Sequence, residues 1–372
     1  MQVQDFTKIL NSDFYTGVPD SQLKALCDYL MDCYGIDKAH HIIAANEGNS
    51  TALAAGYYLS TGKIPVVYMQ NSGEGNIVNP VASLLHKEVY GIPMIFVIGW
   101  RGEPGVPDEP QHIYQGKITQ TLLEDMEIAS VIVGKDSTEK EIVDAMTNFR
   151  TNLENGKSVA FIIQKGALSY DKTPVYKNEN TLNREEVIRH IISVSKTDCV
   201  VCTTGKASRE LFEIREANNE KHHYDFLTVG SMGHASSIAL GIACNKPNKK
   251  IWCIDGDGAV LMHMGAMALI GANAPTNLVH IILNNSAHET VGGMPTAAKK
   301  IDLTAIAKGC GYPNAVCVST LKQLDQALTC AKMSRELTLI EVRCSLGSRH
   351  DLGRPTIPPY ENKTNFMDYL NQ

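Results

Sequence analysis

The sequence has no apolar stretch long enough to cross a membrane. Its longest apolar run, Ile92–Trp100, has nine residues, about half of the ~20 that a membrane-spanning helix needs. Its first residues, MQVQDFTKIL, lack the cationic segment and the apolar core of a secretory signal. We therefore expect a cytoplasmic protein without a membrane partner.

The sequence also has no basic stripe, and its net charge is −6. A nucleic-acid partner is therefore not expected. Hydrophobic residues make up 44% and charged residues 20%, a composition that excludes wholesale disorder. Ten cysteines are scattered along the chain, and in a cytoplasmic protein we expect them to be reduced and mostly buried.

Short apolar runs alternate with helical stretches such as Ser50–Leu59 and Ser236–Ala243. Uniformly apolar strands separated by helices predict an α/β fold with parallel sheets that are buried on both faces. The expected strands are His41–Ala45, Ile64–Met69, Met94–Ile98, Val159–Gln164, Cys199–Cys202, Phe226–Val229, Lys250–Ile254, Leu278–Leu283 and Leu337–Val342.

A length of 372 residues exceeds one typical core, so two domains are expected. Residues 169–183 are polar and without periodicity, which predicts a linker between domains 1–168 and 184–372. An amphipathic helix is expected over Arg184–Val194.

The two halves resemble each other at an offset of 185 residues. Glu47-Gly48 then aligns with Met232-Gly233, and Ser72-Gly73 aligns with Asp257-Gly258. Ile92–Trp100 aligns without a gap with 277–285. This register indicates two copies of one α/β module, and the positions where the copies differ are where we expect the chemistry.

Polar residues follow two expected strands of the second half. Asp255-Gly256-Asp257-Gly258 follows one strand, and Asn284-Asn285 ends the next. In parallel sheets, ligands bind at such carboxyl ends. Glycines let the backbone approach a phosphate, and the N-terminus of the following helix attracts anions. Asp257 and Asn285 offer the hard oxygen ligands that Mg²⁺ accepts, although both residue types are also suited to turns.

Gly256-Asp257-Gly258 followed by Asn284-Asn285 at this spacing resembles the signature of thiamine diphosphate-dependent enzymes. The resemblance implies that thiamine diphosphate and Mg²⁺ are the cofactors. It also implies metal ligation by Asp257, Asn285 and the main-chain carbonyl of Ala287. Cofactor contacts are implied for Gly230, Met232, Gly256, Asp257, Gly258 and Asn285, with Met232 separating the two cofactor rings. Met232 could also be an ordinary core residue.

The first half resembles the pyrimidine-binding domain of the same enzymes, and the second half resembles their diphosphate-binding domain. The implied catalytic acid is Glu47, in Ala44-Ala45-Asn46-Glu47-Gly48. It would bind the aminopyrimidine and relay a proton, because apolar surroundings raise the pKa of a carboxyl group. A glutamate favoured by the helix dipole is the alternative interpretation.

With no middle domain, the chain resembles the compact decarboxylases of phosphonopyruvate and sulfopyruvate. Gly17–Ser21, Asn284–Thr296 and Ser348–Pro355 agree with that resemblance. It implies decarboxylation of 3-phosphonopyruvate to phosphonoacetaldehyde and CO₂ in phosphonate biosynthesis. It also implies a homo-oligomer, at least a dimer, because one subunit's pyrimidine domain and another's diphosphate domain share the cofactor. The alternatives are sulfopyruvate decarboxylase, an acetolactate-type carboligase or a non-catalytic thiamine diphosphate-binding protein.

Two departures from related pyruvate decarboxylases affect the expected proton donor. Those enzymes have an aspartate at the position of Ser21, whereas the aspartate of this chain, Asp20, lies one residue earlier. They also have two histidines where this chain has only His112. The resemblance implies that Asp20 or His112 donates the proton and that Ser21 contacts the substrate. An anionic substrate tail needs cationic partners; the candidates are Arg101, Lys206, Arg209, Arg349 and Arg354.

Overall fold

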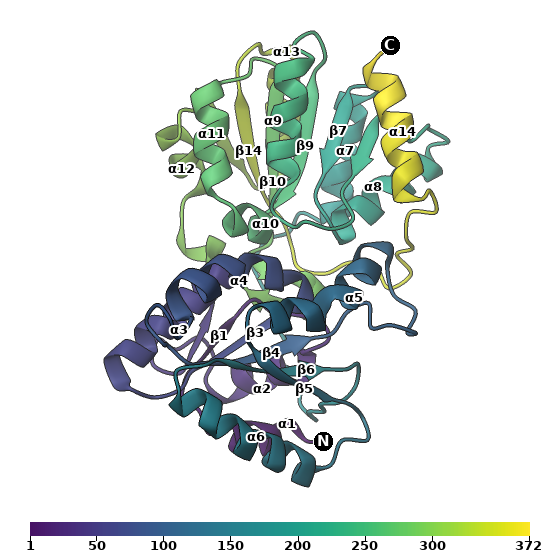
Figure 1. The fold of residues 1–372 in the computed structure, drawn as a ribbon. Coiled ribbons are helices and arrows are strands. Elements are labelled where there is room, and N and C mark those ends of the chain that lie inside the picture. Colours follow the sequence, from purple (N-terminus) through teal and green to yellow (C-terminus); the bar gives the residue numbers. More distant parts are fainter. The chain divides into compact units, whose positions relative to one another are not determined.

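The computed structural model describes all residues, Met1–Gln372. Its contacts divide the chain into two compact units, Met1–Val175 and Tyr176–Gln372. The division falls inside the segment expected as a linker. Figure 1 shows that each unit contains a sheet with helices on both faces.

The first unit contains a six-stranded parallel sheet in the order β2-β1-β3-β4-β6-β5. Its strands are β1 (Tyr15–Gly17), β2 (His41–Ile43), β3 (Val66–Gln70), β4 (Ile95–Gly99), β5 (Ala129–Val133) and β6 (Val159–Ile163). Its α-helices are α1 (Val3–Leu10), α2 (Lys24–Cys33), α3 (Glu47–Thr61), α4 (Glu74–Pro80), α5 (Pro110–Asp125) and α6 (Glu139–Glu154). The short helical turns η1 (Asn71–Gly73) and η2 (Val81–Leu85) flank α4.

The second unit has its own six-stranded parallel sheet, in the order β13-β14-β10-β9-β7-β8. Its strands are β7 (Cys199–Cys202), β8 (Asp225–Leu227), β9 (Ile251–Gly256), β10 (Leu278–Asn284), β13 (Asn314–Val318) and β14 (Thr338–Arg343), and β11 (Ala287–His288) and β12 (Met294–Pro295) form a small hairpin. Its helices are α7 (Arg184–Ser195), α8 (Lys206–Ala217), α9 (Ala235–Asn245), α10 (Asp257–Met262), α11 (Gly265–Asn273), α12 (Leu303–Gly309), α13 (Leu321–Met333) and α14 (Pro359–Leu370), with short turns η3 (Glu289–Val291) and η4 (Ala297–Lys300).

The central strands of the second sheet are buried on both faces, as their uniformly apolar sequences predict. Along β9, Trp252 and Ile254 join the apolar cluster on one face, whereas Ile251 and Cys253 join the cluster on the other. This alternation follows from the two-residue period of a strand. It fixes the register of β9, and with it the place where the strand ends at Gly256.

The two sheets have the same topology, which confirms the predicted duplication. In sequence order within each unit, both sheets run 2-1-3-4-6-5. Glu47 and Met232 both follow the second strand, at the start of α3 and just before α9. Asp257 and Ser72 both follow the third strand. The copies therefore place their differing residues at corresponding points of their own sheets.

All nine predicted strands are present, with ends that differ by at most two residues. The sequence interpretation missed β1, β5, β13 and the β11–β12 hairpin. β1 has only three residues, and β5 and β13 are edge strands with exposed positions. An edge strand has fewer buried positions, so the apolar signal that reveals a central strand is weaker there.

Each unit contains one of the two tryptophans. Trp100, 5% exposed, follows β4 and donates from Nε1 to the carbonyl oxygen of Gly116 at 2.9 Å. Trp252, on β9, is fully buried and donates from Nε1 to Asp198 Oδ2 at 2.8 Å. Both indoles therefore have the hydrogen-bond partner that a buried tryptophan needs.

Two further expectations from the sequence concern the state of the cysteines and the presence of membrane-spanning helices. All ten cysteines are free thiols; five are buried, one is half-buried and four are exposed. The thiols are therefore unpaired as expected, but only half of them are buried. None of the helices combines the length and the apolar character that crossing a membrane requires.

Candidate cofactor and active site

Asp257 lies at the carboxyl end of β9 and begins α10. Its side chain is 2% exposed, and Thr296 Oγ1 donates to its Oδ2 at 2.5 Å. Burial raises the pKa of Asp257 to about 7, although hydrogen bonds from Thr296 and from nearby backbone N–H groups oppose this shift. No cationic side chain forms an ion pair with this carboxylate, so its environment fits a bound metal cation.

Asn285 follows β10, the strand beside β9. Its Nδ2 donates to Glu289 Oε2 at 2.8 Å, and its Oδ1 accepts the N–H of Ala287 at 3.0 Å. Its own backbone N–H donates to the carboxylate of Asp257. The two predicted side-chain ligands of a metal thus lie together at one edge of the second sheet.

Ala287 stands at the start of the β11–β12 hairpin, where it pairs with Pro295. The hairpin closes on the strand end, because the N–H of Thr296 donates to the carbonyl oxygen of Ser286 at 2.9 Å. It thereby brings the Thr296 hydroxyl onto Asp257. Carboxylate, amide and main-chain carbonyl oxygens are the donor set that Mg²⁺ prefers. These residues therefore fit Mg²⁺.

The loop before α9 brings Met232 to the same edge of the second sheet. A Cβ added at Gly258 would stand 3.5 Å from the Met232 methyl carbon and 3.4 Å from His288 Cε1. Gly233 has φ +88°, and a Cβ there would lie 2.7 Å from His263 and 2.8 Å from the carbonyl oxygen of Ala259. Only glycine fits at Gly233 without strain. Met232 is thereby held beside Gly258.

Two other predicted cofactor contacts lie in the same two loops. Gly230 is half-buried and precedes Ser231, which has a left-handed backbone with φ 57°. Gly256 is the last residue of β9 and the N-cap of α10. The second unit thus brings together all the predicted metal and diphosphate residues.

Glu47 is the predicted catalytic acid of the first unit, and it begins α3 after the N-cap residue Asn46. Its side chain is 5% exposed, and Asn76 Nδ2 donates to its Oε2 at 2.7 Å. Burial raises the pKa of Glu47, and the hydrogen bond from Asn76 only partly opposes that rise. The shift favours the protonated form of this carboxyl group.

Gly73 packs directly against Glu47. A Cβ added at Gly73 would lie 2.5 Å from Glu47 Cγ and 2.6 Å from its Oε1. Gly258, the aligned residue of the second unit, lies beside Met232 in the same way, but a Cβ added there would be farther away, 3.5 Å from the Met232 methyl carbon. Corresponding glycines thus border Glu47 in one module and Met232 in the other.

Asp20 follows β1 and is buried with 1% exposure. Gln70 Nε2 donates to its Oδ1 at 2.6 Å, and the N–H of Gln22 donates to its Oδ2 at 3.1 Å. Burial raises the pKa of Asp20, which these hydrogen bonds and the charge of Arg101 oppose. The neighbouring Ser21 is exposed and accepts a 3.3 Å hydrogen bond from Arg101 Nη1.

Arg101, one of the five candidates for binding the substrate anion, is bound to a carboxylate of its own unit. It donates from Nε to Asp108 Oδ2 at 2.8 Å and from Nη2 to the other oxygen of that carboxylate. His112, near the start of α5, lies in the same region, where burial, followed by the charge of Arg101, lowers its pKa to about 4. Asp20, Ser21, Arg101 and His112 are therefore brought together in the first unit.

The remaining cationic candidates belong to the second unit. Lys206, the first residue of α8, donates to Glu289 at 3.2 Å. Arg349 is paired with Glu185 at 3.0 Å, and also with Glu213 and Asp351. Arg209 lies on α8, and Arg354 lies between β14 and α14. Sequence alone could not show that Arg101, Lys206 and Arg349 already have acidic partners.

Several side chains around the site were not predicted from the sequence. They are Asn76 and Gly73 around Glu47, Thr296 on Asp257, and Glu289, Arg184 and Asn178 around Asn285. Gly73 gave a signal because it aligns with Gly258, and Glu289 and Thr296 lie in the segment Asn284–Thr296 that carries the family resemblance. The others are ordinary polar residues whose partners become apparent only in the folded chain.

Comparisons with known proteins agree with this geometry. Residues 4–123 match the thiamine pyrophosphate enzyme N-terminal TPP binding domain, and residues 203–342 match the C-terminal TPP binding domain. Thiamine pyrophosphate is another name for thiamine diphosphate.

Three relatives align over most of the chain. A phosphonopyruvate decarboxylase of Streptomyces viridochromogenes is 33% identical over 95% of this chain and 90% of its own length. A phosphonopyruvate decarboxylase of Streptomyces hygroscopicus is 33% identical over 96% and 90%, respectively. A sulfopyruvate decarboxylase of Methanosarcina acetivorans is 29% identical over 87% of each chain. With both cofactor-binding domains matched and this similarity along nearly its whole length, the chain belongs to the phosphonopyruvate decarboxylase family of thiamine pyrophosphate enzymes.

Proposed function

We propose that this protein decarboxylates 3-phosphonopyruvate to phosphonoacetaldehyde and CO₂, with thiamine diphosphate and Mg²⁺ as cofactors. The observation that carries the proposal is the environment of Glu47, a buried acid with a raised pKa and one hydrogen bond from Asn76. A protein that only bound the cofactor would not need a proton relay. The substrate follows from the two phosphonopyruvate decarboxylases that align with nearly the whole chain.

The second unit supplies the residues proposed to bind the metal and the diphosphate. Asp257, Asn285 and the carbonyl oxygen of Ala287 would ligate Mg²⁺, and the glycines beside Asp257 would leave room for phosphate oxygens. When bound, thiamine diphosphate supplies the electron sink that decarboxylation of a 2-oxo acid needs. The protein contributes orientation, charge compensation and the movement of protons.

In the proposed reaction, Glu47 would bind the aminopyrimidine ring and would hold or release the proton that this ring exchanges. Its buried carboxyl group can hold that proton because desolvation disfavours the carboxylate form. Asn76 fixes one carboxyl oxygen, and Gly73 leaves space for the other. Both contacts hold the acid in one position while it changes protonation state.

Loss of CO₂ leaves an electron pair on the former carbonyl carbon, which takes up a proton to give the aldehyde. We assign Asp20 as the donor in preference to His112. With a pKa of about 4, His112 is neutral at pH 7 and carries no acidic proton to donate from an imidazolium. Burial shifts the pKa of Asp20 upward, which favours its protonated form.

The phosphonate would lie near Arg101 and Ser21, and Lys206 and Arg354 remain proposed contacts. Arg101 presents a planar guanidinium whose Nη1 already reaches the Ser21 hydroxyl. The ion pair with Asp108 holds the guanidinium in place, and the negative charge of Asp108 offsets part of its positive charge. A dianionic substrate would therefore compete with Asp108 for the same donors.

We also propose a homo-oligomer of at least two chains. Helix α11 is apolar around most of its circumference, and it exposes Gly265, Ala268, Leu269 and Ala272. Leu269 is 55% exposed, and Leu59 of α3 is 71% exposed. Helices that are apolar on every side usually pack against further protein.

We propose that the protein is located in the cytoplasm. Its cysteines are unpaired, which fits a reducing compartment.

The proposed function is tested by assaying the purified chain with Mg²⁺, thiamine diphosphate and one of phosphonopyruvate, sulfopyruvate or pyruvate. CO₂ and aldehyde are measured. A site built to pair a tetrahedral anion discriminates strongly against a substrate without one, so phosphonopyruvate should exceed pyruvate by at least about 10³ in kcat/KM. Sulfopyruvate should be intermediate. A preference for sulfopyruvate would assign the chain to the chemistry of the Methanosarcina relative.

A pair of variants tests the contact with the substrate tail. Arg101→Met should reduce the preference for phosphonopyruvate over pyruvate, while thiamine diphosphate affinity remains that of the wild type. Lys63→Met is the matched control, because it breaks an exposed ion pair with Asp13 in the same unit. If both variants keep the wild-type preference, Arg101 does not bind the anion.

A further inference from the structure

The segment that joins the two halves contacts the proposed metal loop. Asn178 Nδ2 donates to the backbone carbonyl oxygen of Asn285 at 3.0 Å and to that of Cys344, also at 3.0 Å. Asn180 Nδ2 donates to the same Cys344 oxygen at 2.9 Å. A stretch that sequence predicts as a linker thus binds the residue after β10 and the residue after β14.

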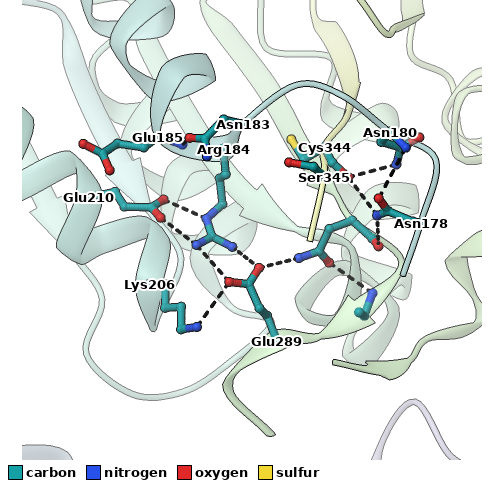
Figure 2. A network of polar contacts seen from close by, with 12 residues as sticks. Asn178, Asn180, Asn183, Arg184, Glu185, Lys206, Glu210, Glu289, Cys344 and Ser345 are labelled. Atoms are coloured by element: carbon teal, nitrogen blue, oxygen red, sulfur yellow. Dashed lines mark hydrogen bonds and ion pairs between the residues drawn. The ribbon is translucent and has the colours of Figure 1, made fainter. Parts of the chain in front are cut away.

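Arg184 extends this contact from the start of α7 (Figure 2). Its guanidinium is buried between two glutamates. It donates to Glu210 at 2.7 and 2.6 Å and from Nη1 to Glu289 Oε2 at 2.5 Å. Lys206 also donates to Glu289. Two cations therefore compensate the charge of Glu289, which is only partly exposed, and fix its carboxylate.

The fixed carboxylate determines how the amide of Asn285 is oriented. The Asn285 Nδ2 donates to the same Glu289 oxygen that accepts from Arg184. If the amide turned over, its Oδ1 would face the carboxylate, and two acceptors would repel each other. Glu289 therefore keeps the amide nitrogen on its own side and leaves Oδ1 as the end available to a cation.

We infer that Asn178, Arg184 and Glu289 form a clamp that positions Asn285 for Mg²⁺. Asn178 holds the backbone of Asn285, and Arg184 acts on its side chain through Glu289. This inference rests on the proposed function, because it assigns positioning residues to the proposed metal site. The three residues come from the joining segment, α7 and η3, so the joining segment is part of the site.

The test measures the Mg²⁺ concentration at which thiamine diphosphate binding is half-maximal, by calorimetry at a series of Mg²⁺ concentrations. Loss of a residue that orients a metal ligand typically weakens metal affinity by 10–100-fold. Glu289→Ala should therefore raise the Mg²⁺ midpoint by at least about 10-fold. Glu289→Gln keeps an oxygen that can accept from Asn285 and should recover part of this loss. Asn178→Ala should raise the midpoint by a smaller factor, and kcat at saturating Mg²⁺ should change less than the midpoint.

Arg215→Met is the matched control in the same unit. Arg215 is buried, like Arg184, and donates to both oxygens of Asp225 at 2.9 Å. Its loss should lower the melting temperature and leave the Mg²⁺ midpoint unchanged. Wild-type midpoints in both Glu289→Ala and Asn178→Ala, or an equal shift in Arg215→Met, would overturn the clamp. A wild-type chain that binds no thiamine diphosphate at any Mg²⁺ concentration would instead refute the proposed function.

Discussion

Replacing Gly73 with alanine should displace the catalytic acid without unfolding the protein. Gly73 has φ −76° and ψ −13°, a conformation that alanine adopts freely. The added Cβ would stand 2.5 Å from Glu47 Cγ, whereas ordinary contacts begin at 3.4 Å. The Glu47 side chain must therefore move by about 1 Å, and a displacement of that size can cost ~10²-fold in rate. The bond from Asn76 to Glu47 would be strained or lost as well.

The assay is hydrogen–deuterium exchange at C2 of the bound cofactor, stopped with acid and read by NMR. Gly73→Ala should slow this exchange by ~10²-fold, while thiamine diphosphate affinity stays close to that of the wild type. Gly75→Ala is the control two residues along the chain, where an added Cβ meets nothing within 4 Å. Exchange at the wild-type rate in a folded Gly73→Ala variant would show that the position of Glu47 does not limit the proton transfer.

Three further predictions concern single side chains. Asp257→Ala should abolish Mg²⁺-dependent retention of thiamine diphosphate. Asn285→Ala should weaken that retention less, because a neutral ligand compensates less of the metal's charge. Normal thiamine diphosphate binding by Asp257→Ala in a Mg²⁺ titration would contradict the metal assignment. Glu47→Gln keeps the shape but cannot relay a proton, so C2 exchange should fall by roughly 10²–10⁴-fold, and an unchanged exchange rate would exclude that role. Glu74 is fully buried, and burial raises its pKa from 4.5 to about 9, although Thr119 and Gln115 oppose part of this shift. The folded state therefore holds a proton that the unfolded state releases between these values, so stability should fall by up to ~1.4 kcal/mol per pH unit as the pH rises through that range. Glu74→Gln, always neutral, should flatten this decline in melting temperature, and parallel curves for the variant and the wild type would show that Glu74 is not the group responsible.

The central strands and their polar ends could be predicted because both signals are local in sequence. β9 and β10 are mainly apolar runs, and the polar residues of the metal motif lie at their ends. The duplication added a second signal, since the repeat of the sequence by itself aligns Glu47 with Met232. Edge strands such as β5 and β13 were missed because their partly exposed positions weaken the apolar pattern.

Side-chain partners could not be predicted in the same way. Arg184 and Glu289 are 105 residues apart in sequence, and nothing in either local sequence indicates the other. Arg101 lies two residues after β4, but its ion pair with Asp108 depends on how the following loop folds back. Residue type shows what chemistry a side chain can perform, whereas packing decides which partner it meets.

The distribution of the two tryptophans has a practical consequence for spectroscopy. Trp100 belongs to the first unit and Trp252 to the second, and both indoles are almost entirely shielded from water. Trp252→Phe would leave a fluorophore that reports only on the first unit, and Trp100→Phe would leave one that reports only on the second. Denaturation of the two variants, followed by emission wavelength, would therefore distinguish halves that melt together from halves that melt in succession.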